Sequence, residues 1–310
     1  MAVSTVSDRL AEMVLGIKEP LRALLDVHSS IHHEPTRTIG GRTEMTPWGP
    51  RERGGGVSMG YSMWKALSPE GTRAQAAALA RYQAFAAVVR VLLAGQPQKV
   101  LKEFDDNDGA ILAAIQQDSW PQGATTQDVL AKANQALDGQ LALVTNLFDG
   151  SGGEAVVVPD TNALLFNPNL EDWAFDGIGR FTVILLPTVL RELDALKMNH
   201  RVEDVRKKAE GLITRIKGYR GRGQLNQGVP LRKGVSTLRG WGTEPNMKDS
   251  LPWLDPANDD DRLLASFLEV MRQFPHSEVI LVTRDINLQN KAELAQVCFL
   301  EPPAVPGTTP

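Results

Sequence analysis

The sequence predicts a mostly α-helical N-terminal domain over residues 1–150 and an α/β domain with a parallel sheet over residues 151–310. Three observations support this arrangement. Long helical stretches fill most of the first half, whereas short β-branched runs alternate with helices in the second. Between the halves stands the stretch Asp149-Gly-Ser-Gly-Gly153, and short Gly/Ser stretches often join domains.

Composition excludes some classes of protein. The chain has 310 residues and a net charge of −4, so any affinity for nucleic acid must come from a local basic surface. Cys298 is the only cysteine, which rules out an intrachain disulfide. The N-terminus has no basic segment followed by an apolar run, so it does not resemble a secretory signal. Together these absences favour a cytoplasmic location.

The first half is expected to contain four helices, over residues 7–28, 72–93, 98–117 and from about Thr125 onward. Its most apolar stretch, 76–93, is interrupted by Arg81 and Arg90, so it predicts an amphipathic helix rather than a membrane span. Residues 34–60 are rich in Gly, Pro and Arg, and no structure is predicted for them. This domain could select substrate, form a homo-oligomer or bind a protein partner, and its sequence does not choose among these roles.

The second half alternates strands and helices. Short apolar runs at 155–158, 181–186, 279–282 and 297–300 predict strands. Helices are expected between and around them, at 188–197, 202–217, 260–273 and 288–295. This alternation is typical of a parallel sheet covered on both faces, in which functional groups gather at the carboxyl ends of the strands.

Four acidic residues stand at or near these strand ends. Asp160 follows the first strand and Asp285 the third, while Glu192 lies one turn into the helix after the second. Asp261 opens the helix that begins in NDDDRLLAS. Each acid alone could be a turn or helix cap, or a solvated helix residue. As a set they would repel one another unless a cation lay among them.

The chemistry of these side chains indicates the cation. Carboxylate oxygens suit Mg²⁺ or Mn²⁺, whereas zinc prefers Cys and His. Two such ions, roughly 4 Å apart, can activate a water and stabilise the leaving oxygen of a phosphodiester. The residues therefore predict a metal-dependent hydrolase that acts on phosphodiester bonds.

Four segments resemble the PIN domain family in family order: VVVPDTNALLFNP, ILLPTVLRELDALK, NDDDRLLAS and VILVTRDINLQNKA. The resemblance covers residues 155–302, and the last segment is most similar to the large PIN branch found beside PhoH-like ATPases and in RNA-surveillance endonucleases. It implies a Rossmann-like fold and a metal-dependent ribonuclease. The chain has no G-x-x-x-x-G-K-[ST] loop, so no ATPase is expected within it.

The resemblance also assigns roles to residues. It places the catalytic and metal-binding acids at Asp160, Glu192, Asp261 and Asp285, with support from Asn162, Thr283 and Asp260. Because three aspartates adjoin in NDDDRLLAS, the third acid is ambiguous by a residue. Asp194 could be an outer acid or a simple surface charge. No essential acid is missing, so an active enzyme is expected.

A basic stretch predicts where RNA would bind. Between Lys197 and Arg239 lie twelve basic and three acidic residues, a net charge of +9. The residues expected to contact nucleic acid are Arg220, Arg222, Arg232, Lys233 and Arg239. Residues 218–256, with Tyr219, Trp241 and Trp253, are expected to form a flap over the metal site and stack unpaired bases. Alternatively, the basic helix is an ordinary solvated surface and the tryptophans pack onto the domain.

Three functions remain open at this point. The first is an endoribonuclease that cleaves single-stranded RNA, the second is a nuclease of related chemistry that prefers DNA or structured ends, and the third is a nucleic-acid-binding scaffold without catalysis. A toxin with a neutralising partner is a further role known in the family, but such toxins are usually single small domains. His28, His32 and His33 cluster without a nearby Cys or an H-E-x-x-H pattern, so they are interpreted as chance surface histidines rather than a zinc site.

Overall fold

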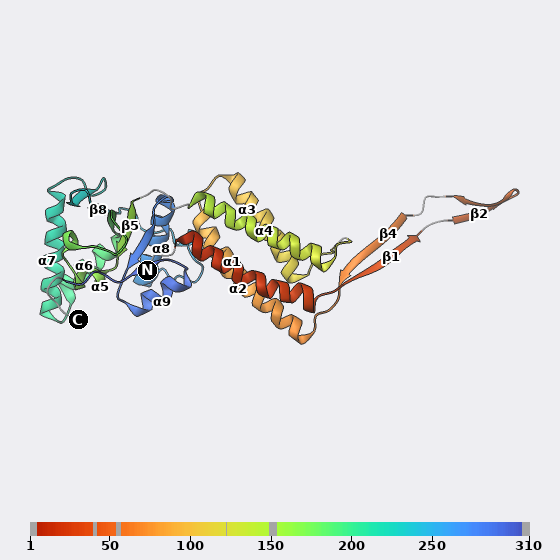
Figure 1. Cartoon of the computed structure of the whole chain (residues 1–310), viewed down its shortest axis with the longest axis horizontal. Coiled ribbons are helices and arrows are strands. Elements are labelled where there is room, and N and C mark those ends of the chain that lie inside the picture. The colour runs from red at the N-terminus through yellow and green to blue at the C-terminus, as the bar shows by residue number, and fades with distance from the viewer. Residues whose placement is uncertain (1–4, 40–41, 54–56, 122, 149–153, 306–310) are drawn as a thin grey trace. The chain divides into compact units, whose positions relative to one another are not determined.

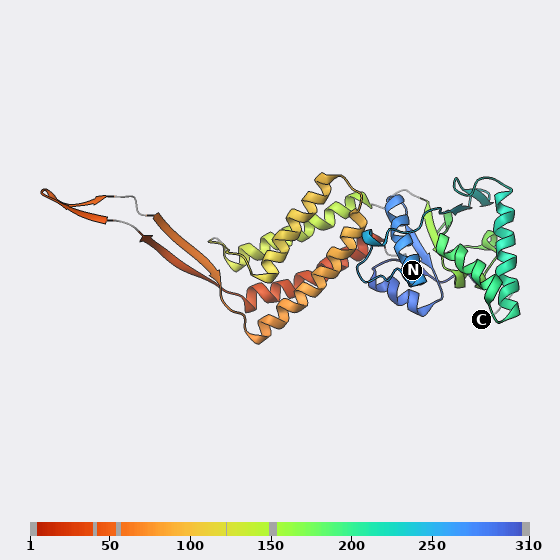
Figure 2. The same ribbon diagram turned by 180° about the vertical axis from the view of Figure 1, so that it is seen from behind.

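The computed structural model describes residues 5–39, 42–53, 57–121, 123–148 and 154–305. The chain separates into two compact units, which Figures 1 and 2 show from opposite sides. One unit comprises residues 13–86 and 98–141, and the other comprises residues 1–12, 87–97 and 142–310. The predicted junction at 149–153 lies outside the described residues.

The four expected helices of the first half are confirmed with small shifts at their ends. They are α1 (Val6–Arg22), α2 (Pro69–Leu93), α3 (Gln98–Gln116) and α4 (Thr126–Leu147). Helix α1 runs through Pro20 and continues as a π-helical turn, η1 (Ala23–His28). Val14, Ile17 and Leu21 are buried at spacings of three and four residues, which is the apolar stripe of an amphipathic helix.

The stretch for which no structure was predicted contains four antiparallel strands. Strand β1 (Ile31–Ile39) pairs with β4 (Val57–Trp64), and β2 (Arg42–Thr46) pairs with β3 (Gly49–Arg53). The turn between β2 and β3 presents Trp48, which is almost fully exposed. The N-terminal half is therefore mostly helical but not wholly so. Its strands went unpredicted because their Gly, Pro and charged residues are all disfavoured in strands.

Helix α2 is, within the described part of the chain, the one helix long and apolar enough to cross a membrane by length and composition. Half of its apolar window is buried inside the protein. Arg81 and Arg90 are exposed, and Arg81 Nη1 donates to the carbonyl of Gly16 at 2.6 Å. These features agree with the amphipathic core helix expected from the sequence.

The second half alternates strands and helices as expected. Its strands are β5 (Ala155–Pro159), β6 (Phe181–Leu185), β7 (Val229–Arg232), β8 (Ser236–Gly240), β9 (Val279–Val282) and β10 (Phe299–Leu300). Its α-helices are α5 (Thr161–Phe166), α6 (Pro187–Asn199), α7 (Glu203–Arg220), α8 (Asp259–Gln273) and α9 (Ile286–Leu294). Two short 3-10 turns, η2 (Leu170–Asp172) and η3 (Met247–Asp249), complete it.

These strands form one sheet in the order β10-β9-β5-β6-β8-β7, parallel throughout except for β7. From β5 the chain winds outward through β6 to β8, then returns to β9 on the other side of β5 and continues to β10. Because parallel crossovers are right-handed, this reversal puts α5–α7 and α8–α9 on opposite faces (Figure 1). Strands β5 and β9 are buried along their whole length, as the two helical layers require.

The prediction that residues 218–256 form a flap is wrong for the central part of this segment. Strands β7 and β8 form a hairpin that extends the sheet, with Phe181 to Leu185 of β6 in register with Ser236 to Gly240 of β8. Trp241 is buried, which confirms the packing alternative for that residue, whereas Trp253 is 39% exposed. The hairpin escaped prediction because both strands are short and carry Pro, Gly and Arg, which weaken the strand pattern.

One buried polar group in the helical unit makes a test of stability. The Gln140 side chain is fully buried, and its Nε2 donates to Tyr82 Oη at 3.0 Å and to the Phe104 carbonyl at 3.3 Å. We expect Gln140→Leu to destabilise this unit by about 1–3 kcal/mol, because it strips a partner from buried polar atoms. Urea unfolding measures the change. Gln83→Leu, on the exposed face of α2, is the control, and equal effects of the two changes would contradict the prediction.

Candidate functional site

The sheet reverses its direction of winding between β5 and β9, and Asp160 lies at the carboxyl end of that junction. The Asp160 amide donates to the Val282 carbonyl at 3.0 Å, which extends the pairing of β5 and β9 by one residue. In doubly wound sheets the crevice at such a reversal is where ligands bind. The fold therefore places the first predicted acid at the expected position.

Two hydrogen bonds hold the Asp160 carboxylate. Thr283, just past β9, donates from Oγ1 to Asp160 Oδ2 at 2.5 Å, and the Ala163 amide donates to Oδ1 at 2.6 Å. The second bond makes Asp160 the N-cap of α5. The carboxylate is thus anchored to both strands at the reversal, and its residue is only 4% exposed.

Thr283 also connects Asp160 to the fourth predicted acid. Its Oγ1 accepts a hydrogen bond from the Asp285 amide at 2.9 Å while donating to Asp160. Asp285 itself is the N-cap of α9, with Oδ1 accepting from the amides of Asn287 at 2.8 Å and Leu288 at 3.2 Å. Asp285 lies near Asp160. One oxygen of its carboxylate is already hydrogen-bonded to the start of its own helix.

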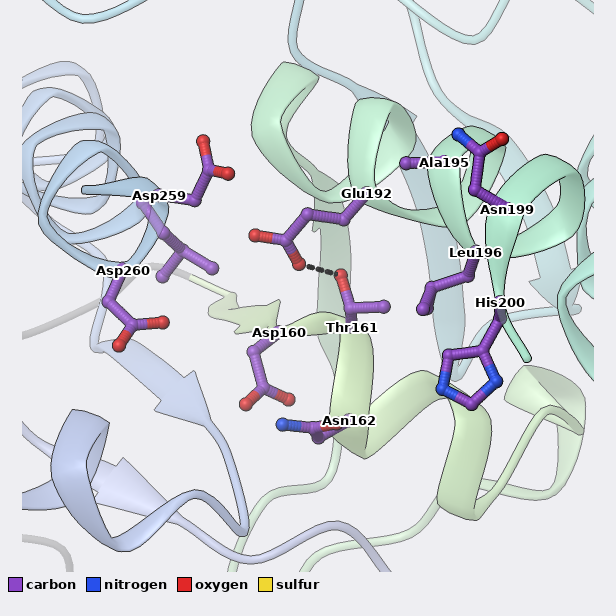
Figure 3. Close-up of a pocket in the computed structure, with 11 residues that line it drawn as sticks. Asp160, Thr161, Asn162, Glu192, Ala195, Leu196, Asn199, His200, Asp259 and Asp260 are labelled. Atoms are coloured by element: carbon purple, nitrogen blue, oxygen red, sulfur yellow. Dashed lines mark hydrogen bonds between the residues drawn. The ribbon is translucent and has the colours of Figure 1, made fainter. Parts of the chain in front are cut away.

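Glu192 is held by a residue that the sequence did not single out. Thr161, next to Asp160 and 5% exposed, donates from Oγ1 to Glu192 Oε2 at 2.5 Å (Figure 3). Helix α6 begins right after β6, so its second turn lies over the carboxyl edge of the sheet. Two adjacent residues, Asp160 and Thr161, thereby tie the first and second acids together.

The three aspartates of α8 point to different places. Asp259 and Asp260 line the same cavity as Asp160 and Glu192, whereas Asp261 does not. Asp261 is 6% exposed, and its carboxylate binds Lys291 Nζ at 2.7 Å and the Asp255 amide at 2.9 Å. Asp261 is thus buried and engaged outside the cavity lining, whereas its neighbour Asp260 lines the cavity.

Two basic side chains lie close to the acids of α8. Lys291 Nζ, besides contacting Asp261, lies 3.5 Å from Asp260 Oδ2. Arg191 contacts Asp259 at 2.8 Å and Glu244 at 3.1 Å. Neither Lys291 nor Arg191 was predicted as a partner, because each lies far in sequence from the aspartate that it contacts. Asp160 and Glu192 have no such basic partner among the described residues.

The cavity has a volume of about 440 Å³ and an acidic lining. Its polar side chains at the sheet edge are Asp160, Thr161, Asn162, Glu192, Asp259 and Asp260. Figure 3 shows Asp259 and Asp260 on α8 facing Glu192 on α6, with Asp160 and Asn162 below them. Asn199 and His200 line the far end along α6. The predicted residues Asp160, Asn162, Glu192 and Asp260 are thus brought together.

Burial and mutual repulsion disfavour negative charge in this cavity. The pKa of Asp160 is raised to about 6, first by burial and then by the charges of Asp285 and Asp260, although the hydrogen bonds from Thr283 and Ala163 lower it. The pKa of Glu192 is also raised, first by burial and then by Asp259, Asp260 and Asp160, although the Thr161 hydroxyl lowers it. A cation in the cavity would relieve both effects.

The donor set fits a hard divalent cation, although the carboxylates are not yet gathered around one point. In the described part of the chain, no three His, Cys, Asp or Glu side chains are arranged so that they could hold a metal ion as they stand. Asp160 and Glu192 are each bound by a threonine hydroxyl instead. Carboxylate oxygens of this kind suit Mg²⁺ or Mn²⁺, which usually keep several waters and need few protein ligands.

The residues predicted to bind nucleic acid do not line the acidic cavity. The turn between β7 and β8 carries Lys233, and Arg232 ends β7. Both lie at the amino edge of the sheet, opposite Asp160. Arg222 contacts Glu171 at 3.3 Å, and Arg239 donates from Nε to the Asn226 carbonyl at 3.0 Å. Arg220, at the end of α7, lines a second cavity.

Comparison with known proteins agrees with the fold. Residues 157–299 match the family model of the PIN domain, and this range contains every acid discussed above. No curated protein matches the chain. The match, the mostly parallel six-stranded sheet and the acids at its reversal point to one family. The C-terminal half of the chain therefore contains a PIN domain, over residues 157–299.

Proposed function

We propose that the PIN domain is a metal-dependent endoribonuclease that hydrolyses phosphodiester bonds in single-stranded RNA. PIN domains are generally nucleases. The observation that carries the proposal is the cavity at the sheet reversal, where Asp160 and Glu192 face Asp259 and Asp260 and, among the described residues, form no ion pair with a basic side chain. Buried carboxylates without a partner are costly, and a divalent cation is the compensation that these oxygens select.

Each residue of the cavity would have a defined task. Asp160, Glu192 and Asp260 would hold Mg²⁺ or Mn²⁺, with Asp285 close enough to add a ligand or orient a water. When bound, the cation would polarise the phosphodiester and lower the pKa of a water molecule. Thr283 and Thr161 hold the carboxylates of Asp160 and Glu192 in place, and Asn162 lies beside Asp160 at the mouth of the cavity.

The first test concerns activity. We expect Asp160→Asn to abolish cleavage of single-stranded RNA in Mn²⁺ or Mg²⁺, because it removes a ligand charge. The fold should persist, since Asn caps a helix about as well as Asp. The control is Asp176→Asn, an exposed carboxylate in the loop before β6.

The same assay separates the competing functions. It measures cleavage of matched RNA and DNA strands, with EDTA as the metal-free arm. Faster cleavage of DNA than of RNA would replace the substrate named here. RNA binding by the wild-type protein without cleavage in any metal would leave a scaffold as the function instead.

The second test uses the pKa of Asp160, which is about 6 in the folded protein and 3.8 when unperturbed. An acid with a raised pKa holds its proton more tightly when folded, so metal-free stability should fall as pH rises from about 4 to about 6. The Asp160→Asn variant should not show this loss of stability with rising pH, because Asn does not titrate. In EDTA at pH 7 the variant should therefore exceed the wild type by up to about 3 kcal/mol.

Urea unfolding at pH 4 and pH 7 measures this difference, which should nearly vanish at pH 4. Adding Mn²⁺ at pH 7 should stabilise the wild type much more than the variant, because the cation binds only the folded state. A wild-type protein whose stability is indifferent to Mn²⁺ would contradict the metal-binding role of Asp160.

The third test asks which aspartate of α8 serves the metal. Asp260→Asn should weaken Mn²⁺ binding about tenfold or more with little loss of stability. Asp261→Asn should instead cost about 1–3 kcal/mol of stability, since it breaks the contact between a buried carboxylate and Lys291. Calorimetric titration with Mn²⁺ and urea unfolding distinguish the two. The reverse pattern would assign the third ligand to Asp261, as the resemblance suggested.

A further inference from the structure

A second cavity lies on the other side of α6 from the acidic one. It has a volume of about 390 Å³ and combines an apolar lining with a few polar groups. Leu185, the last residue of β6, and Trp241, just past β8, contribute from the sheet. The Trp241 amide donates to the Leu185 carbonyl at 2.9 Å, which continues the pairing of these strands. The cavity therefore opens at the same carboxyl edge as the acids.

The two cavities share α6 as a wall. Leu190 and Asp194 line the second cavity and are four residues apart, whereas Glu192, Leu196 and Asn199 line the acidic one. Residues at i and i+4 lie on one face of a helix, so the two sets occupy different faces. Because a helix with its side chains is about 10–12 Å wide, the cavities are only a helix width apart.

Two cations at the second cavity have no partner within the described part of the chain. Lys217 and Arg220, in the last turn of α7, line it and form no ion pair or side-chain hydrogen bond with the described residues. Other arginines of the basic stretch are engaged: Arg215 with the Pro168 carbonyl, and Arg222 with Glu171. Few basic side chains of the predicted RNA-binding stretch are therefore left without a partner among the described residues, and two of them line the second cavity.

This combination of groups fits one chemical class of ligand. Ligand pockets of about 300–1,000 Å³ are mostly apolar with few polar groups, which describes this cavity. An apolar wall that includes Trp241 can receive a base, while Lys217 and Arg220 supply charge for a phosphate. Asp194 and Asn226 offer hydrogen-bonding groups to the edge of the base.

We propose that the second cavity binds one nucleotide of the single-stranded RNA substrate, with the strand crossing α6 to reach the acidic cavity. The base enters the apolar cavity and its phosphate is held by Lys217 and Arg220. This inference rests on the proposed nuclease function, but it concerns binding and can be tested without cleavage.

The test is RNA binding in EDTA, followed by fluorescence anisotropy of a labelled ten-nucleotide single strand. We expect the double change Lys217→Ala and Arg220→Ala to weaken binding about tenfold or more and to lower the salt dependence by one to two phosphate contacts. The control removes two exposed cations outside both cavities, Arg180→Ala and Lys248→Ala, and should change affinity less than twofold.

A set of strands with one abasic position each tests the base. For the wild type, one position should lose most affinity when its base is removed, and the Lys217/Arg220 double variant should lose this sensitivity. In Mn²⁺ the same double variant should have a higher KM and a nearly unchanged kcat, because Lys217 and Arg220 do not line the acidic cavity.

The outcomes separate this inference from the proposed function. Equal RNA affinity of the double variant and the wild type, with cleavage intact, overturns the nucleotide site and leaves the nuclease. Loss of binding in the double variant, with no cleavage by the wild type in any metal, supports the site and overturns the nuclease. A wild-type protein that does not bind the strand overturns the nucleotide site outright.

Discussion

The hydrogen bonds of Thr283 determine how the rest of the cavity is arranged. This hydroxyl donates to Asp160 and accepts from the Asp285 amide, so one atom joins the ends of β5 and β9 where the sheet changes direction. Thr161 repeats the arrangement one residue after Asp160 by binding Glu192. Two hydroxyl groups thus set the positions of three acids from three segments. Each hydroxyl binds a carboxylate without neutralising its charge. Because these hydroxyl donors are uncharged, they leave the negative charge of the carboxylates in the cavity uncompensated.

Charge compensation within the domain is uneven, because the aspartates of α8 contact basic side chains whereas Asp160 and Glu192 do not among the described residues. Asp261 and Asp259 each meet a basic side chain, Lys291 and Arg191 respectively. Within the described residues, the carboxylates of Asp160 and Glu192 contact hydroxyl and amide groups but no basic side chain, and burial raises the pKa of each carboxyl group. Such an uncompensated charge carries a cost that protonation, or the divalent cation proposed here, would offset.

The sequence predicted the α/β fold with helices on both faces of the sheet, because four strands were apolar, β-branched runs bounded by helices, and burial on both faces demands that pattern. It missed β7 and β8, since a short edge hairpin with Pro, Gly and Arg carries no such pattern. Asp160, Asn162, Glu192 and Asp260 were predicted from strand ends and the family resemblance, and the structure brings them together. The third acid could not be resolved, because consecutive helix residues differ by about 100° in direction and three aspartates adjoin. Lys291 and Thr161 were missed, since their partners are distant in sequence.

Helix α6 separates the two cavities, and its fixed width would have a consequence for the products of the proposed reaction. A helix of thirteen residues packed against α7 does not change its width as substrate binds. A nucleotide seated on one side and a bond broken on the other would then be a constant number of nucleotides apart. The domain would act as a ruler along the strand, so the cut would be offset from the recognised base rather than adjacent to it.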